Sequence, residues 1–299
     1  MESARLIDSG YVSQPPRRVR SPSRESPAAA HNYDDGTAAR RTTGHVTYFF
    51  GPFRVIIDGQ PLREATWRRS SAKTLLKWLL LSPGEPFSAD CLWSMLWPDL
   101  AANRAARNLS VTLHCLRHLL EPQLPARQAS MFIRSDNHKN YWFDLAGIWH
   151  TDVEEAWDLQ DIGRKAERQG DLLQAVDAYQ RVVTIYSKSF LPEDVYDDCF
   201  VDHRHDHDVA HIRAAGQLMK LYLRTDQLSK ALFSAISALA RDPFDRDAVI
   251  TVVEVYSRQG NITGAIRQVD ELIRRSRHEF GTIDDPELLA LRAALLRAG

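Results

Sequence analysis

The segment Asn103–Glu121 carries residue types that read nucleic acids. Arginine, asparagine and histidine side chains recur on the side of the segment that its apolar residues leave free. Guanidinium and amide groups contact phosphates and base edges, so such a face suits DNA contact. The apolar residues recur at helical spacing and predict one buried stripe. They are Ala106, Leu109, Leu113, Leu116 and Leu120.

Signals at both ends of this segment set it in a larger unit. We expect Asn103 to cap the helix, because its side chain can accept from an unpaired N–H, and Pro122 to end it. A shorter helix capped by Ser88 should precede it, before the break at Trp97–Asp99. Two helices joined by a short turn, the second with a polar outer face, are typical of a helix-turn-helix. The apolar face of the first is predicted from Ala89, Leu92, Trp93 and Leu96.

A hairpin is expected after the helix pair. Met131–Arg134 and Asn140–Phe143 are predicted as strands, and Ser135–Lys139 as their turn. A hairpin that follows a recognition helix is a wing. The simpler interpretation of the polar face is that any amphipathic helix exposes one side to solvent. The segment before the helix pair therefore also bears on whether this face contacts DNA.

That segment is predicted to hold strands and one more helix. Residues 45–62 are rich in β-forming residues, and Asp58-Gly59 is a strong hairpin turn signal. A helix should begin near Ser70 and stop at Pro83-Gly84. Lys73 and Lys77 lie off its apolar stripe, which consists of Ala72, Leu75, Leu76, Leu79 and Leu80.

Charged residues are distributed unevenly along the chain. The 299 residues carry a formal net charge of −1. Residues 45–150 hold 12 Lys and Arg against 8 Asp and Glu, whereas residues 151–299 hold 19 against 26. A basic part followed by an acidic part suits a nucleic-acid reader joined to a protein-facing module.

The remaining composition indicates a reduced, cytoplasmic protein. Its three cysteines, Cys91, Cys115 and Cys199, are far apart and lack CxxC spacing. No apolar run approaches membrane-spanning length, and no signal core follows the start. Residues 1–44 are rich in Ser, Pro, Arg and Ala, so we expect a disordered tail whose removal leaves stability nearly unchanged.

The second half is predicted to be helical and repetitive. Leu218, Tyr222, Asp226 and Ala231 align with Val252, Tyr256, Gly260 and Ala265 at a spacing of 34 positions, the tetratricopeptide period. A looser third copy contains Ala166, Gly170 and Ala175. The small residues at the alanine positions should let paired helices approach closely, and Arg241–Pro243 should end a helix. Stacked helix pairs form a concave surface suited to a peptide or protein.

One histidine cluster allows a metal hypothesis. His203, His207 and His211 share a face if the segment is helical, and histidines at that spacing can bind zinc. The simpler interpretation, which we favour, is a solvated polar face of a long helix. Motifs of the GxxxxGK, GxSxG, HExxH and CxxC types are absent, so we expect no catalysis, no metal and no cofactor.

Three motifs resemble those of SARP/AfsR-type bacterial activators, whose DNA-binding half is an OmpR-like winged helix-turn-helix. They are Phe50–Val55, Leu96–Asp99 and Asn108–Arg117. Phe190–Asp198, and the ending with Glu279–Gly281 and Pro286-Glu287, are similar to the bacterial transcriptional activator domain of that family. The resemblance covers residues 45–299.

The expected architecture is therefore multidomain. A tail (1–44) precedes an α+β winged helix-turn-helix domain (45–148), and an all-α tetratricopeptide-like repeat domain (149–299) follows. The resemblance implies a transcriptional activator that binds double-stranded promoter DNA, with RNA polymerase or a second copy as further partners. Two alternatives stay open: a tetratricopeptide adaptor whose winged helix has only a structural or protein-binding role, and a metal-dependent hydrolase.

The candidate DNA-binding residues come from three places: the helix that begins near Ser70, the predicted recognition helix, and the wing. They are Arg68, Arg69, Lys73, Asn103, Arg104, Arg107, Asn108, Ser110, Val111, His114, Arg117, His118, Arg134 and Lys139.

Overall fold

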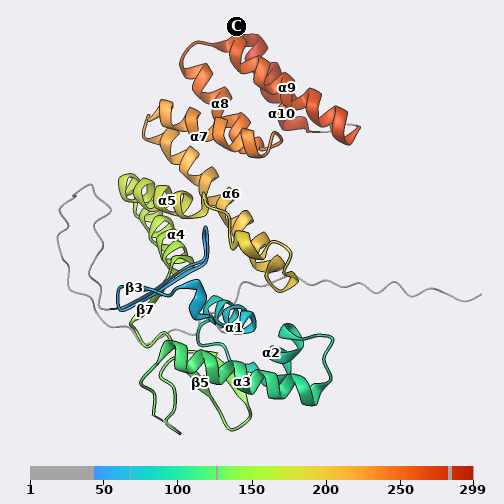
Figure 1. Ribbon diagram of the computed structural model, residues 1–299. Coiled ribbons are helices and arrows are strands. Elements are labelled where there is room, and N and C mark those ends of the chain that lie inside the picture. Colours follow the sequence, from blue (N-terminus) through green and yellow to red (C-terminus); the bar gives the residue numbers. More distant parts are fainter. Residues whose placement is uncertain (1–43, 68, 126, 282–284, 299) are drawn as a thin grey trace, which may run out of the picture.

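The computed structural model describes residues 44–67, 69–125, 127–281 and 285–298. Strands and helices mix in the first part of the chain, and helices alone make up the rest (Figure 1). The strands are β1 (His45–Tyr48), β2 (Arg54–Ile57), β3 (Gln60–Pro61), β4 (Phe87–Ser88), β5 (Ile133–Ser135), β6 (Asn140–Phe143) and β7 (Trp149–Thr151). The helices are α1 (Ser70–Leu81), α2 (Ala89–Leu96), α3 (Ala102–Leu120), α4 (Asp152–Gln169), α5 (Leu172–Tyr186), α6 (Val201–Arg224), α7 (Leu228–Arg241), α8 (Arg246–Arg258), α9 (Ile262–Phe280) and α10 (Pro286–Ala298). Short 3-10 turns are η1 (Glu64–Thr66), η2 (Pro192–Asp194) and η3 (Asp198–Phe200).

The first sheet joins residues from both sides of the expected domain boundary. Its strand order is β3-β2-β1-β7, with β1 antiparallel to β2 and parallel to β7. Asp58 and Gly59, both at positive φ, make the turn that the Asp-Gly signal predicted. Because β7 runs directly into α4, the sheet physically connects the two parts of the chain.

The second sheet is the expected hairpin with one added strand. β5 and β6 pair antiparallel, with Arg134 opposite Trp142, and β4 pairs with the other edge of β6. α1 also follows the prediction: its stripe from Ala72 to Leu80 is buried, at no more than 3% exposure for any member. Together these elements fit a winged-helix-like domain.

The helical part consists of antiparallel pairs joined by equivalent tight turns. Gly170, Asp226 and Gly260 have φ of 79°, 56° and 74° and separate α4 from α5, α6 from α7 and α8 from α9. In each turn the next N–H donates to a carbonyl five residues earlier, at 3.0, 2.8 and 2.8 Å. Ala231 and Ala265 have no exposed surface, as the repeat predicted for positions where helices touch. Asp242 caps the end of α7, where the sequence predicted a break.

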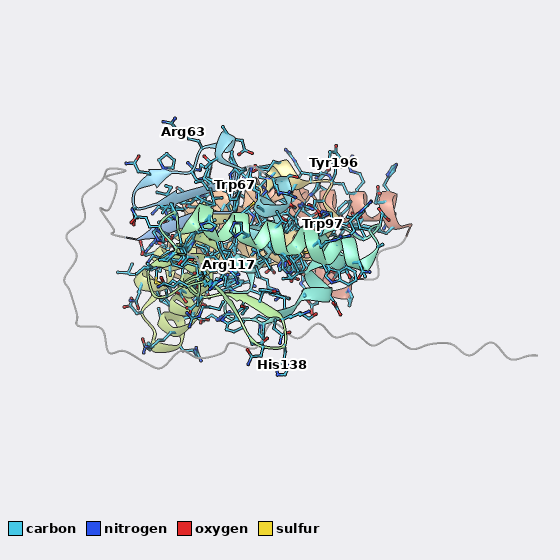
Figure 2. The ribbon with its side chains drawn as sticks, turned by 60° about the horizontal axis from the view of Figure 1, so that its bottom comes forward. Arg63, Trp67, Trp97, Arg117, His138 and Tyr196 are labelled. Atoms are coloured by element: carbon cyan, nitrogen blue, oxygen red, sulfur yellow. The ribbon has the colours of Figure 1, made fainter. Side chains whose placement is uncertain are left out.

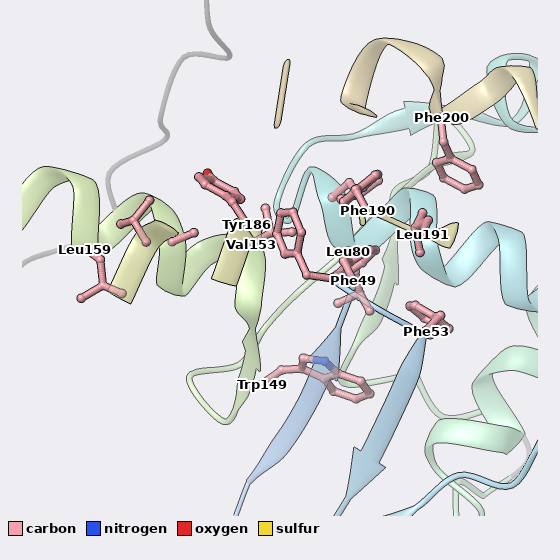
Figure 3. Packing of buried hydrophobic residues seen from close by; sticks show 14 of the residues in the cluster. Phe49, Phe53, Leu80, Trp149, Val153, Leu159, Tyr186, Phe190, Leu191 and Phe200 are labelled. Carbon is pink, nitrogen blue, oxygen red and sulfur yellow. The ribbon is translucent and has the colours of Figure 1, made fainter. Parts of the chain in front are cut away.

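The core does not stop at the expected boundary. Phe49, Phe50 and Phe53 lie among Phe190 and Leu191 from the segment between α5 and α6 (Figure 3). The backbone of this segment also pairs with the first part: Leu191 N–H donates to Phe49 O at 2.9 Å, and Gly51 N–H to Ser189 O at 2.8 Å. The boundary at 148/149 stays a prediction, and a single hydrophobic cluster extends across it.

Lys77 is a buried charge at this junction rather than a solvated one. Its side chain is 2% exposed, and its ammonium group donates to Asp194 and lies 3.9 Å from Glu193. The Phe53 ring lies 4.7 Å from the Lys77 nitrogen. An ammonium removed from water needs such partners, because an unpaired buried charge is very costly.

The histidine row was wrongly interpreted as a solvated face. His207 is 6% exposed and contacts the rings of Phe50 and Phe190, with centroids 5.2 and 4.5 Å away. His203 lies edge-on to Trp78 at 5.5 Å, so α6 turns His203 and His207 toward the first part of the chain. Desolvation, with a smaller contribution from nearby His203, lowers the pKa of His207 to about 3. Across the described ranges no group of three His, Cys, Asp or Glu residues is placed to hold a metal.

A separate apolar cluster stabilises the end of the chain. It contains Val249, Val253 and Ala265 with residues of α9 and α10, and it shares no buried member with the larger cluster. In Figure 1, α9 and α10 lie at the opposite end of the molecule from α3.

Across the described parts of the chain, no helix combines the length and apolar character needed to cross a membrane. The predicted tail, apart from Gly44, lies outside the described residues.

Candidate nucleic-acid interface

α3 is held by one apolar side and one hydroxyl contact. Leu109, Leu113, Leu116 and Leu120 are at most 3% exposed, as predicted. Ala105 rather than Ala106 completes the stripe: Ala105, four residues before Leu109, is buried, and Ala106 is exposed. Thr112 is also buried, and its hydroxyl lies 3.3 Å from that of Ser71 on α1.

The expected cap of α3 was wrong. The helix begins at Ala102, so Asn103 lies inside its first turn, and the capping position Ala101 provides no side-chain hydrogen bond. The preceding helix follows the prediction more closely. Ser88 caps α2 by accepting from Cys91 N–H at 3.2 Å, and the chain turns at Trp97 before α3 begins.

Seven residues form the outward face of α3, on the side opposite the buried stripe. All are exposed except Asn108, which is half-buried. In Figure 2, α3 lies across the front of the view, with the β5–β6 hairpin below it. Its members are Arg104, Arg107, Asn108, Ser110, Val111, His114 and His118.

Contacts within the helix orient several of these side chains. Arg107 Nε donates to Asn103 O at 3.2 Å, which holds this exposed side chain against the preceding turn of the helix. Ser110 Oγ donates to Ala106 O at 3.1 Å, so its hydroxyl proton is used inside the helix. His114 and His118 lie one turn apart with ring centroids 4.4 Å from each other.

The hairpin has a tightly ordered tip. The Asp136 carboxylate accepts from His138 N–H at 2.8 Å and from Asn140 N–H at 2.9 Å. Hydrogen bonding to Asn140 is the main cause that holds the pKa of Asp136 below its ordinary value. Lys139 adopts positive φ at the tip, and both it and Arg134 are exposed. His138, which was not among the site residues predicted from the sequence, lies at the tip in Figure 2. Its place in the predicted turn was the sequence signal for this position.

Arg117 does not belong to the outward face. Its guanidinium donates to Ile133 O at 3.2 Å, so it connects α3 to the hairpin. It is half-buried, and its Nε is enclosed without a hydrogen-bond partner. The predicted site residue therefore positions the hairpin against the helix.

Lys73 is also engaged inside the protein. It donates to Glu64 at 3.1 Å and to Glu193 at 3.4 Å, and its side chain is 16% exposed. Lys73 is one of the candidate DNA-binding residues, yet a carboxylate from η1 and another from η2 lie against its ammonium group. Arg69 is exposed at the start of α1, whereas Arg68 lies outside the described residues.

Comparison with known proteins agrees with this architecture. Residues 151–296 match the family described as the bacterial transcriptional activator domain. No curated protein matches the chain. Among solved structures, Mycobacterium tuberculosis EmbR in complex with a low affinity phosphopeptide has a similar fold, with a TM-score of 0.73 and 16% identity. The alignment covers 85% of this chain and 65% of that one, so the chain spans just under two thirds of the EmbR chain. The MamA protein aligns at 20% identity over 48% of this chain and 88% of that one, with a TM-score of only 0.22.

Proposed function

Because this chain carries a bacterial transcriptional activator domain, as its resemblance to the SARP/AfsR-type activators implied, we propose that it is a sequence-specific transcriptional activator that binds promoter DNA. In this proposal residues 45–148 act as the winged helix-turn-helix domain. α3 enters the major groove, and the β5–β6 hairpin contacts the adjacent backbone as a wing.

The observation that carries the proposal is the outward face of α3. It presents arginine, asparagine and histidine side chains on a helix whose other side is buried against α1. Such donors recognise base edges and phosphates, and helix docking needs an unobstructed convex helix. In Figure 1, α3 lies at the end of the molecule away from α9 and α10.

We assign DNA-contact roles to the candidate residues from their positions on α3, at the start of α1 and on the hairpin. Arg107 and Asn108, near the helix start, are assigned to base edges, and His114 and His118 to bases or phosphates further along. Arg69, Arg104, Arg134 and Lys139 are assigned to phosphates, since they are exposed around this face. Lys73 and Arg117 are reassigned as structural residues. The ammonium group of Lys73 already pairs with carboxylates, and the guanidinium of Arg117 already donates to a backbone carbonyl.

The helical pairs α4–α10 supply the second part of the function. Their stacked arrangement suits self-association or contact with RNA polymerase, and their surplus of acidic residues favours a basic partner surface. A regulator of this kind acts on the chromosome, so we place it in the cytoplasm.

A binding selection with the full-length chain tests the proposal. Randomised duplex DNA is enriched on the protein, and the recovered site is titrated against a scrambled duplex. Arg107→Ala should weaken specific binding by about 1–3 kcal/mol and relax preference at one base position. Arg213→Ala, which removes an exposed arginine of α6, is the matched control and should bind as the parent does.

Two outcomes would contradict the proposal. If the parent enriches no sequence, the adaptor alternative is favoured. If a folded Arg107→Ala variant binds both duplexes as the parent does, α3 is not the reading helix.

A further inference from the structure

One apolar side chain interrupts the polar outward face of α3. Val111 is 43% exposed, although β-branched residues are poorer helix formers than alanine. In the described chain before Thr151, the exposed large hydrophobic side chains are Val111 and Met131. All others of this kind in that part are buried or half-buried, so exposure of Val111 is exceptional there.

The position of Val111 places it among the donors rather than at their margin. Arg107 lies four residues before it, Asn108 three before and His114 three after, so all three are its neighbours on the helix surface. Helical spacing of 100° per residue puts Val111 near the middle of the outward face, opposite the stripe around Leu116. A ligand that meets the guanidinium of Arg107 and the ring of His114 must also cover the methyl groups of Val111.

B-form DNA offers one apolar group to such a helix. In the major groove the thymine C5 methyl is the apolar feature of the base edges, and it is read by apolar side chains. Valine suits this contact because its single χ1 angle is stiff in a helix, so little freedom is lost on binding.

We propose that Val111 reads the methyl group of a thymine in the major groove, and so specifies a T·A pair at the middle of the site contacted by α3. The assignment rests on the proposed function and adds the chemical identity of one recognised base. Arg107 and His114 would then flank this base pair on either side along the helix.

Removal of single methyl groups from the DNA tests the contact between Val111 and thymine. The duplex recovered by selection is resynthesised with each thymine replaced in turn by deoxyuridine, which lacks only the C5 methyl. Loss of one buried methyl group should weaken binding by the parent about fourfold at one position. Val111→Ala should bind the thymine duplex about as weakly as the parent binds the deoxyuridine duplex. The variant should no longer distinguish deoxyuridine from thymine at that position.

Two controls separate this inference from the proposed function. Val195→Ala removes a valine that is 51% exposed in the segment before α6, and it should keep the parent's discrimination. Thermal melting of each variant checks folding. If the parent selects a site but tolerates deoxyuridine at every position, or if Val111→Ala still discriminates, the thymine contact is overturned and the proposed function stands. If the parent selects no site, both are overturned.

Discussion

The Asp152 carboxylate accepts hydrogen bonds from the N–H of Phe49, 103 residues earlier, at 2.8 and 3.0 Å. The same carboxylate accepts from Phe50 N–H at 3.0 Å. Burial raises its pKa to about 6, against the lowering effect of these N–H donors. A residue in the first turn of α4 thus satisfies the backbone where β1 ends, which binds the helical part to the sheet.

We therefore expect that residues 45–150 alone are unstable. The fragment lacks Asp152 and the buried Phe190 and Leu191, so Phe49, Phe50 and Phe53 lose their cover. A fragment of residues 45–241 retains these contacts and should unfold cooperatively. Circular dichroism melting of both fragments checks this, and a sharp cooperative transition in the shorter one would restore an independent first domain.

The Lys77–Asp194 pair should show strong coupling. Lys77→Met or Asp194→Asn alone leaves one buried charge without its partner, and each should cost about 3–5 kcal/mol of unfolding free energy. The double variant should cost clearly less than the sum of the two. Urea unfolding of all four proteins measures the cycle; strict additivity would show that the pair makes no net interaction.

Acid should weaken the packing of α6 through His207. Its folded-state pKa of about 3 lies below the ordinary 6.5, so its stabilising contribution is complete above pH 6.5 and is lost as the pH falls toward 3. At pH 5 the loss should be about 2 kcal/mol relative to pH 7.5. His207→Gln should remove this difference, and a parallel pH dependence in parent and variant would contradict it. Asp152 gives the opposite trend, but it is present in both proteins.

The repeat alanines should not tolerate larger side chains. Ala231→Leu and Ala265→Leu should each destabilise by about 1–3 kcal/mol, because both positions are fully buried between helices. Ala240→Leu on the exposed side of α7 is the control and should change stability little. Chemical denaturation compares the three; an unchanged midpoint for Ala231→Leu would mean that the helix pairs are loosely packed.

The sequence by itself determined the elements whose signals are local. α1, the Ser88 cap, the Asp58-Gly59 turn, the β5–β6 hairpin and the 34-residue spacing of the turns after α6 and α8 all depend on residues close in the chain. Helical and strand periodicity and turn chemistry act over that range, so the fold of each part could be predicted.

Tertiary structure decided where each side chain of those elements is directed. Lys77, Lys73 and His207 look like surface residues in sequence, yet each has at least one partner from a segment more than a hundred residues away. Arg117 likewise turned to the hairpin instead of the outward face. Periodicity reveals which side of a helix is apolar, but polar residues become buried only when a distant segment supplies a charge, a carbonyl or a ring against them. That pairing is a property of the assembled core.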